Sequence, residues 1–440
     1  MEKRLRCRAL RSPVTVSLDG ENFAAEAGEP LAVALYGHGI RAWSRSPKFH
    51  RPRGPACFRG SCEGCLLRVN GVPNVMSCLV PAEEGQVLET QNTLGTRDID
   101  LLIMADWLFP HGVNHHELFA GVPVLQDVMQ NLARRVVGLG VLPSEGAASK
   151  SGPARPAIRR HVPILIVGGG AAGMAAATAF ARHGLEVELV EESSGAGGSL
   201  RALSPAARQR FAALEAAFGE VCEAGRVTVR PRTLAAAIFP TDPADERKTP
   251  PERSVLLVSD RAELVTSDTL VLATGTHDAM PAFPGNDVPG VLPLRAAGWL
   301  LAHGVLPGRK PLFLVPHTDH VFAAEAGELA ASCSGTVVFG EVERVHGTSH
   351  VSAVSVVTSG KVQKFGCDAL VVCAPRSPAY ELALQCGATV QHEDRGFRVC
   401  TQAGSTIAPG AFATGSLIGQ AHDPAGYVLT ATNIVRAALG

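Results

Sequence analysis

The chain has 440 residues, which is enough for about three folding units and a sizeable hydrophobic core. Lys and Arg total 40 and Asp and Glu total 41, so the formal charge of −1 argues against a protein that binds nucleic acid by neutralising phosphates. The hydrophobic fraction of 46% and the charged fraction of 18% exclude a disordered chain.

The N-terminal residues 1–13 hold five basic side chains with no apolar segment after them, so we expect no secretory signal. The most apolar run, residues 164–181, contains four glycines that suit a turn rather than a bilayer, so we expect no transmembrane segment. These features predict a cytoplasmic protein. In such a protein the eleven cysteines are thiols or ligands, not disulfides.

Residues 14–92 have the pattern of a small strand-rich unit. Val14–Leu18 alternates as strands do, and Leu66–Asn70, followed by Gly71, has the pattern of a strand entering a turn. Leu31–Tyr36 has the pattern of a short helix. Helical patterns follow over residues 95–142, notably at Val124–Val137. Residues 144–160 are rich in Ser, Ala, Gly, Pro and basic residues, which predicts a linker.

Four cysteines crowd the first unit, separated by four, two and twelve residues: Cys57, Cys62, Cys65 and Cys78. Four thiolates can hold a [2Fe–2S] cluster, two on each iron, and the small residues between them allow a tight loop. A zinc site and four unrelated buried thiols are the alternatives. Zinc ribbons usually present two CxxC pairs and only one is found here, so the spacing favours the cluster.

Residues 41–60 carry six basic side chains and no acid: Arg41, Arg45, Lys48, Arg51, Arg53 and Arg59. Basic groups near a cluster favour its reduced, more negative form and would raise its potential. A solvated basic surface, or a patch on which a partner docks, explains the same composition equally well.

A dinucleotide-binding pattern begins at residue 164. An apolar strand is followed at once by Gly168, Gly170 and Gly173 in GxGxxG spacing, and these glycines open a helix over 171–182. The first glycine makes a tight turn, the second lets the backbone approach a pyrophosphate, and the third allows close helix–strand packing. A second strand over 186–190 ends at Glu191, which is placed to bind a ribose diol.

Two further features favour FAD over NAD as the ligand of this fold. Gly197 and Gly198 follow Glu191 at a spacing seen in flavoproteins, and an Ala-Thr-Gly sequence ends a later strand. Near the C-terminus a similar Ala-Thr-Gly precedes Ser416, where many flavoproteins have Asp, a stronger ligand for the ribityl chain. The candidate cofactor-binding residues are Gly168, Gly170, Ala172, Gly173, Glu191, Glu192, Gly198, Ala273, Thr274, Gly275, Gly415 and Ser416.

A second nucleotide-type fold is expected next. Pro311–Val315 suits a strand and residues 322–331 suit a helix, but Pro316, Thr318 and Val321 stand where the three glycines would be. These bulkier residues should hold a pyrophosphate off the backbone, so we expect the fold without NAD(P)H binding. Strands are also expected at 254–258, 269–273, 336–339 and 369–374, and their alternation with helices predicts a parallel α/β sheet.

Together these segments resemble one family, the α subunits of heteromeric amine and imino-acid oxidoreductases. Its members include sarcosine oxidase, opine oxidase, hydroxyproline dehydrogenase and hydrogen cyanide synthase. Arg45–Gly54 is similar to the RSFKYHRPRG stretch of the sarcosine oxidase α subunit, and Ala273–His277 and Phe283–Gly290 resemble its ATGAHER and FPGNDRPGV runs. Cys57–Cys78 resembles the small iron–sulfur subunit of the cyanide synthase type. The resemblance covers nearly all of residues 14–440.

The resemblance implies an oxidoreductase acting on CH–NH groups, with a [2Fe–2S] cluster and FAD as cofactors. A flavin-containing, amino-acid-oxidase-like β subunit would oxidise an amino or imino acid, and electrons would pass through flavin and cluster to an acceptor. NAD could occupy the glycine-rich fold in place of FAD, as in the sarcosine oxidase α subunit. A self-contained NAD(P)H-dependent reductase and a non-catalytic scaffold for a flavin oxidase are the alternatives. No catalytic residue stands out from the sequence.

The predicted fold class is multi-domain α/β: a β-grasp ferredoxin-like domain followed by a flavoprotein unit with two dinucleotide-binding, Rossmann-like domains. The iron–sulfur domain is expected at 1–94, and a helical region with a flexible linker at 95–160. The FAD-binding domain should be discontinuous, made of 161–285 and 380–440. The degenerate NAD(P)-type domain is expected at 286–379.

Overall fold

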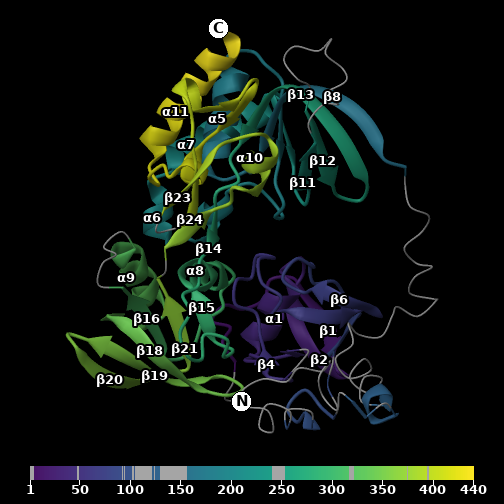
Figure 1. Cartoon of the computed structure of the whole chain (residues 1–440), viewed down its shortest axis with the longest axis vertical. Helices are drawn as coiled ribbons and strands as arrows, with labels where there is room; N and C mark the ends of the chain where they lie inside the picture. The colour runs from purple at the N-terminus through teal and green to yellow at the C-terminus, as the bar shows by residue number, and fades with distance from the viewer. Residues whose placement is uncertain are drawn as a thin grey trace. The chain divides into compact units, whose positions relative to one another are not determined.

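The computed structural model describes residues 4–46, 49–91, 93, 95–101, 104, 121–122, 124–128, 156–239, 253–316, 322–373, 375–393 and 396–440. The chain forms two compact units, whose helices and strands are labelled in Figure 1. The first unit contains residues 1–152 and 280–374, and the second contains residues 153–279 and 375–440. Of the helix predicted at Val124–Val137, only 124–128 are described, and they are helical.

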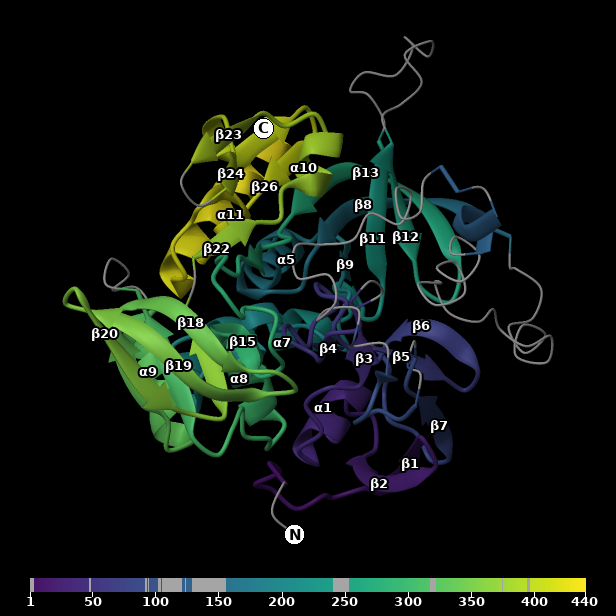
Figure 2. The same ribbon diagram turned by 60° about the horizontal axis from the view of Figure 1, so that its bottom comes forward.

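The first unit begins with a five-stranded mixed sheet in the order β2-β1-β7-β5-β6 (Figure 2). The polar–apolar alternation of β1 places Val16 and Leu18 in the core, and α1 is buried along its whole length. This arrangement is the predicted β-grasp. Its elements are β1 (Pro13–Leu18), β2 (Glu21–Glu26), α1 (Leu31–Gly37), β5 (Leu66–Val69), β6 (Val72–Met76) and β7 (Gln86–Glu89), with a short pair β3 (Ser44–Arg45) and β4 (Pro52–Arg53).

The rest of the first unit is a parallel four-stranded sheet in the order β15-β21-β16-β17. Alternate residues of β16 enter two separate cores: Phe313 packs with helices α8 and α9, and Leu312 and Leu314 pack with the antiparallel sheet β18-β19-β20. The elements are β15 (Val291–Pro293), α8 (Leu294–Ala302), β16 (Pro311–Val315), α9 (Ala323–Ser332), β17 (Thr336–Phe339), β18 (Glu341–Gly347), β19 (Val351–Thr358), β20 (Lys361–Gly366) and β21 (Ala369–Val372).

The second unit is built on a larger sheet in the order β10-β9-β8-β13-β12-β11, with β26 also paired to β13. Strands β10, β9, β8, β13 and β26 are parallel, and β12 and β11 continue as an antiparallel meander. Helices α5, α7 and α11 pack on one face through Ile164, Ile166 and Phe180. The bounds are β8 (Ile158–Val167), α5 (Ala171–Arg182), β9 (Val187–Val190), α7 (Ala212–Glu223), β10 (Val227–Arg230), β11 (Leu234–Phe239), β12 (Ser254–Val258), β13 (Ala262–Leu272), β26 (Ala411–Ala413) and α11 (Pro424–Leu439).

Smaller elements complete the second unit. Strands β14 (Thr276–Asp278) and β22 (Arg376–Pro378) pair antiparallel, and they lie just before and just after the residues that belong to the first unit. The others are η2 (Gly198–Ala202), α6 (Pro205–Gln209), α10 (Glu381–Gln385), β23 (Val390–Glu393), β24 (Gly396–Val399), η3 (Ala403–Ser405), β25 (Thr406–Ala408) and η4 (Gly415–Ile418).

The strands predicted at 254–258, 311–315 and 336–339 and the helix predicted at 171–182 have these same bounds in the structure. The linker prediction is wrong for residues 158–160, which open β8 and pair with β13. This part of β8 alternates half-buried with exposed residues, so it lacks the apolar run by which the sequence indicates a strand. In the described residues, no helix is both long enough and apolar enough to span a membrane.

A cross-strand ion network explains why that polar stretch is a strand. Arg160 on β8 donates to Glu188 on β9 and, at 2.6 Å, to Glu263 on β13. Arg230 on β10 donates to Glu263 at 2.8 Å and lies 3.3 Å from Glu188. The Glu263 side chain is only 3% exposed, and the Arg230 and Arg160 guanidinium groups lower its pKa to about 2.

Candidate functional site

The four predicted cluster ligands lie together in the β-grasp domain. Cys57, Cys65 and Cys78 are buried and Cys62 is half-buried. The loop that carries the first three is tightly wound: a side chain at Gly64 would place its Cβ 2.0 Å from the Gly54 carbonyl oxygen. Gly60 adopts a φ of 78°, in the region that favours glycine. The small residues between the cysteines therefore have the steric role that the sequence predicts.

The four thiols are arranged as two pairs. Cys57 interacts with Cys62, and Cys65 interacts with Cys78. Within each pair the interaction lowers the pKa of one thiol and raises that of the other: the pKa of Cys62 falls to about 5 and that of Cys65 is also lowered, while the pKa values of Cys57 and Cys78 rise. The four thiols therefore lie as two close pairs.

Backbone N–H groups surround the sulfur atoms. Arg59 and Ser61 donate to the Cys57 sulfur at 3.4 and 3.3 Å, and Gly60 donates to the Cys78 sulfur at 3.3 Å. Such donors stabilise negative charge on thiolates and on a cluster that they bind. The inward-facing N–H groups fit an anionic iron–sulfur centre.

The paired arrangement fits one of the metal sites that the spacing allows. A [2Fe–2S] cluster takes two thiolate ligands on each of its two irons. Two close pairs of thiols meet that requirement.

Three arginines of the basic segment 41–60 have carboxylate partners in other segments. Arg41 lies 3.4 Å from Asp368, and Arg53 lies 3.1 Å from Asp287. Arg45 is buried and lies 4.0 Å from Asp100, which is also 3.0 Å from His50. These three arginines therefore pair with carboxylates of other segments and form no free basic surface. Their partners lie far along the chain, where local spacing gives no sign of them.

The predicted phosphate turn joins β8 to α5. Gly168 has a φ of 105°, and its Cβ would lie 2.3 Å from the Ala273 carbonyl oxygen. A Cβ at Gly173 would lie 1.9 Å from the Gly168 carbonyl oxygen, which is the close helix–strand approach that the third glycine permits. At Gly170 a Cβ would meet nothing within 4 Å in the described structure, so open space lies beside this backbone.

The N-terminus of α5 suits an anionic ligand. Gly170 is the N-cap residue, no side chain caps the helix, and the first turn holds no acidic residue. The first N–H groups of a helix have no intrahelical partner and carry partial positive charge. With the open space at Gly170, they form a cradle that fits the pyrophosphate of a dinucleotide such as FAD.

Glu191 follows β9 and lies beside this cradle. Its carboxylate accepts hydrogen bonds from the Gly169 N–H at 2.8 Å and the Ser193 N–H at 2.9 Å. Each oxygen keeps a further lone pair, so Glu191 can still accept from a ribose diol. Glu192, the neighbouring candidate, is exposed.

The other candidate residues come from three separate turns of the second unit. Gly198 lies against the phosphate turn, where its Cβ would be 2.8 Å from the Gly170 Cα. Gly415 approaches Ala172 in the first turn of α5, where its Cβ would be 2.7 Å from that of Ala172. The structure thus brings segments more than 200 residues apart to one helix N-terminus.

The Ala-Thr-Gly turn after β13 completes this region. Ala273 contacts Gly168 and Gly173, and a Cβ added at Gly275 would lie 3.8 Å from the Ser416 hydroxyl oxygen. The Thr274 hydroxyl donates to the Ala379 carbonyl at 2.9 Å, so it has a structural partner. Thr414, which precedes Gly415, is buried, and its hydroxyl has no partner among the described residues.

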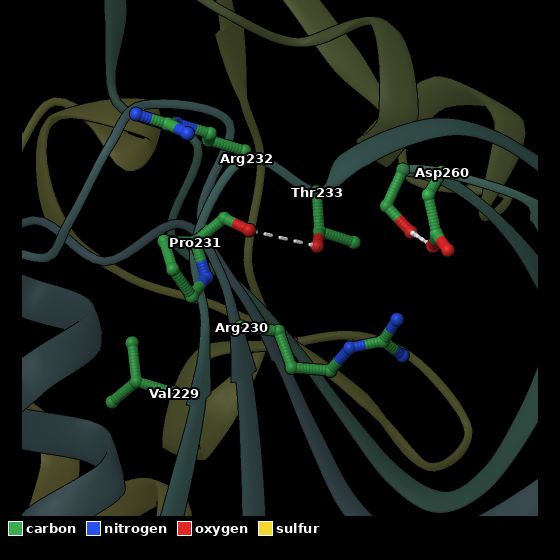
Figure 3. A pocket seen from close by; sticks show the side chains of 7 residues that line it. Val229, Arg230, Pro231, Arg232, Thr233 and Asp260 are labelled. Atoms are coloured by element: carbon green, nitrogen blue, oxygen red, sulfur yellow. Dashed lines mark hydrogen bonds between the residues drawn. The ribbon is translucent and has the colours of Figure 1, made fainter. Parts of the chain in front are cut away.

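A pocket of about 600 Å³ lies at the carboxyl end of β10 (Figure 3). Its lining is Val229, Arg230, Pro231, Arg232, Thr233, Ser259 and Asp260. Backbone bonds from Thr233 to Glu191 and from Arg232 to Ser193 connect this pocket to the acid that would bind a ribose. The pocket therefore lies next to the loop that carries Glu191.

Arg201 is a charged residue of this region that the sequence patterns do not single out. It lies in η2, against Gly197, and its guanidinium is 3.4 Å from the Gly195 carbonyl oxygen. Desolvation lowers its pKa, and the charge of Glu191 acts in the opposite direction. The signal that could have found it is a basic residue within the helical turn that follows the Gly-Gly pair, three residues after Gly198.

The turn of the second nucleotide-type fold is described only in part. Pro316 directly follows β16, where the first fold has Gly168. Thr318 and Val321 lie outside the described residues. The prediction that this turn binds no NAD(P)H stays a prediction.

Two protein-family models match the chain. The model of a 2Fe-2S iron-sulfur cluster binding domain matches residues 11–93, and that of a pyridine nucleotide-disulphide oxidoreductase matches residues 162–299. The first range contains all four candidate cysteines, and the second contains the phosphate turn and Glu191. These matches confirm the predicted cofactors, a [2Fe–2S] cluster and FAD, and the predicted oxidoreductase class.

Curated relatives match large parts of this chain. The sarcosine oxidase subunit alpha of Rhizobium meliloti is 27% identical over 85% of this chain and 41% of its own length. The subunit of the same name from Corynebacterium sp. (strain P-1) is 28% identical over 72% of this chain and 29% of its own length. Hydrogen cyanide synthase subunit HcnB of Pseudomonas aeruginosa is 35% identical over 34% of this chain and 31% of its own length. The chain thus spans less than half the length of these relatives.

A solved structure supports the fold across the whole chain. L-proline dehydrogenase from P.horikoshii matches with a TM-score of 0.72 and 21% identity, covering 99% of this chain and 76% of its own. The match confirms the fold class: a ferredoxin-like domain followed by a flavoprotein unit of two nucleotide-type folds. The chain is therefore a relative of the sarcosine oxidase α and hydrogen cyanide synthase HcnB subunits that carries an N-terminal 2Fe-2S domain.

Proposed function

We propose that this chain is the electron-transferring FAD and iron–sulfur subunit of a multi-subunit enzyme that oxidises an amino or imino acid. The observation that carries the proposal is the presence, in one chain, of four gathered thiols that receive backbone N–H bonds and of an open glycine cradle suited to a dinucleotide. Several relatives are named as subunits of larger enzymes, which supports a partner chain.

The residues of this chain would bind and shield the two redox groups. The four cysteines would ligate iron, and the N–H groups of Arg59, Gly60 and Ser61 would stabilise the negative charge of the centre. The first turn of α5 would bind the pyrophosphate, and Glu191 the ribose. When bound, FAD exchanges one or two electrons and a [2Fe–2S] cluster exchanges one at a time, so together they divide a two-electron oxidation into single steps.

We assign oxidation of the substrate to a partner, a flavin-containing subunit of the amino-acid-oxidase type. The sequence of this chain shows no acid, base or substrate-binding residue at a recognisable spacing, whereas its cofactor ligands are complete. A sarcosine-, proline- or opine-type substrate would be consistent with the relatives. The electron acceptor would be a separate molecule.

A self-contained NAD(P)H-dependent reductase is the second candidate. It requires a nucleotide at the carboxyl edge of the β16 sheet, where Pro316 provides no N–H and cannot make the tight glycine turn. This observation favours the first proposal. A non-catalytic scaffold is disfavoured because the four thiols keep a ligand arrangement that a scaffold would not need.

An anaerobic visible and EPR spectrum of the full purified chain tests the proposal. We expect flavin and cluster bands, about two irons per chain, an EPR signal after dithionite reduction, and no bleaching by NADH. Bleaching by NADH would show a self-contained reductase. Absence of both iron and flavin from protein purified anaerobically would contradict the proposal.

Cysteine variants make the test specific. Cys65→Ser removes a ligand of the second thiol pair and should abolish the EPR signal and reduce the iron content. Cys222→Ser, at a half-buried cysteine of α7, is the matched control and should leave both unchanged. Co-expression with a flavin oxidase encoded by an adjacent gene should then make an amino or imino acid bleach the bands.

A further inference from the structure

The β-grasp domain contacts one edge of the second nucleotide-type fold within the first unit. Tyr36, in α1, donates its hydroxyl proton to the Pro307 carbonyl at 2.8 Å. The Arg41 guanidinium donates to the Asp368 carbonyl at 3.0 Å and lies 3.4 Å from the Asp368 carboxylate. Tyr36 and Arg41 also bond each other at 2.9 Å, so they form one connected group.

All these contacts lie at the amino ends of the parallel strands. Pro307 lies in the loop before β16, Asp368 directly precedes β21, and Gly290, whose Cβ would lie 3.2 Å from the Arg41 guanidinium, directly precedes β15. Ligands of parallel α/β sheets bind at the opposite, carboxyl edge. At about 3.3 Å per residue, the five residues of β16 separate the two edges by roughly 15 Å.

The N-terminal segment makes a second, independent connection to this edge. The N–H groups of Leu5 and Arg6 donate to the carbonyl of Gly37, at the end of α1. The Cys7 N–H donates to the Gly304 carbonyl, and the Leu306 N–H donates to the Leu5 carbonyl. One short segment thus bonds the β-grasp helix on one side and the loop after α8 on the other.

The connected group also reaches the cysteine loop. The Tyr36 ring meets the Phe58 ring edge-on, with centroids 5.3 Å apart, and Phe58 directly follows Cys57. Both rings are essentially fully buried. On the other side, the Arg41 carbonyl packs directly on Gly54, whose own carbonyl packs on Gly64 between Cys62 and Cys65. A displacement of Tyr36 or Arg41 would therefore move the loop that holds the sulfur atoms.

Asp368 stabilises the loop at the amino edge of the sheet, where Tyr36 and Arg41 bind. Its two carboxylate oxygens accept hydrogen bonds from the N–H groups of Arg309 and Lys310, each at 2.8 Å. These bonds fix the loop that presents the Pro307 carbonyl to Tyr36. The single carboxylate therefore bonds both the docking loop and the arginine that supports the cysteine loop.

We propose that the 280–374 fold holds the iron–sulfur domain in a fixed position. Tyr36, Arg41 and Asp368 are the residues that position the domain. The inference goes beyond the proposed function by giving this fold a role, and it rests on that function only in requiring a bound cluster. The amino edge of the nucleotide-type sheet serves as the docking platform. A change at Asp368, which contacts none of the four cluster cysteines, is transmitted to the cluster through Arg41 and Tyr36.

The test compares the reduced cluster in four full-chain variants with that of the unmodified chain. Asp368→Asn keeps the side-chain shape but weakens the bond with Arg41 and the bonds with both N–H groups. Tyr36→Phe removes only the hydroxyl and keeps the ring against Phe58. Both should shift the EPR g values and the midpoint potential of the cluster relative to the unmodified chain. Asp268→Asn, at an exposed residue of the second unit, is the control and should shift neither.

A purely structural role would lower the melting temperature without changing the cluster spectrum. Unchanged g values and potential in both Asp368→Asn and Tyr36→Phe would therefore overturn the proposal, whatever their melting temperatures. Should Asp368→Asn fail to fold, Tyr36→Phe alone decides, because it removes only the hydroxyl and its two hydrogen bonds. Arg41→Lys, which keeps the charge but not the forked geometry, should give an intermediate shift. Absence of iron from the unmodified chain would instead contradict the proposed function.

Discussion

The two parallel sheets of this chain share a nucleotide-type fold but present different edges for contact. In the second unit the carboxyl edge carries the glycine turn, Glu191 and the pocket. In the 280–374 fold the corresponding turn begins with Pro316, and the amino edge receives Tyr36 and Arg41. The fold alone therefore does not determine the function; the residues at each edge do.

The glycine content of the turns shows how this difference arises. Gly168 and Gly173 let two backbones approach so closely that even a methyl group would collide with a carbonyl. Such an approach brings N–H groups to the surface of the turn, where an anion can reach them. A proline at the same place provides no N–H group for an anion. The sheet of the 280–374 fold can therefore serve a structural role instead.

The largest effect is expected from Gly173→Ala. The added methyl carbon would lie 1.9 Å from the Gly168 carbonyl oxygen, and relief of this overlap requires backbone movement. We expect a loss of about 3 kcal/mol in unfolding free energy and loss of bound FAD. Urea unfolding and the flavin content measure these effects. The control is Gly219→Ala in α7, where the new methyl group meets nothing in the described structure and should stabilise by about 1 kcal/mol.

Glu263→Gln tests the cross-strand ion network, which the sheet of the second unit has and, among the described residues, the sheet of the 280–374 fold does not. It leaves Arg160 and Arg230 with Glu188 alone and should lower the unfolding free energy at pH 7 by about 2 kcal/mol. The pKa of Glu263 is depressed from 4.5 to about 2, so its contribution is present above pH 4.5 and is lost as the pH falls towards 2.

The difference between Glu263→Gln and the unmodified chain should therefore shrink when unfolding is measured at pH 4 and then at pH 3. Glu341→Gln, at an exposed residue of β18, should show no such dependence. A difference that stays constant from pH 7 to pH 3 would show that the ion network does not account for the loss.

Gly170→Ala should have a smaller and more selective effect. Its methyl group would enter the open space beside the α5 N-terminus, so the fold should be kept and the pyrophosphate should bind less closely. We expect about tenfold weaker FAD binding, roughly 1.4 kcal/mol. Fluorescence titration of FAD into the deflavinated chain measures it, with Gly195→Ala as the control. Equal affinity in the two variants would place the pyrophosphate elsewhere.

The smallest effect is expected from Pro316→Gly. This change restores the first glycine of the second fold, but Thr318 and Val321 remain at the other two positions. We expect no NADH binding by calorimetry. If NADH did bind, a single residue would account for the difference between the two sheets.

Sequence reasoning predicted the features that depend on local pattern. The cysteine spacing, the GxGxxG turn and the apolar strands such as Pro311–Val315 are set by neighbouring residues, and the structure contains them. The start of β8 at Ile158 was not predictable from apolar periodicity, because its polar side chains are stabilised by Glu188 and Glu263 on other strands. The Arg41–Asp368 contact joins residues 327 positions apart, and no spacing rule connects them.

The interrupted second unit also has a consequence for the order of folding. Leu272 of β13 pairs with Ala413 of β26, and residues 280–374 of the first unit lie between them in the chain. During synthesis the β-grasp domain and the 280–374 fold are complete before β26 and α11 emerge from the ribosome. Contacts of such long sequence separation form late and slowly. Iron can therefore be inserted into a finished domain while the nucleotide sheet is still open, so loading of the two cofactors does not have to be simultaneous.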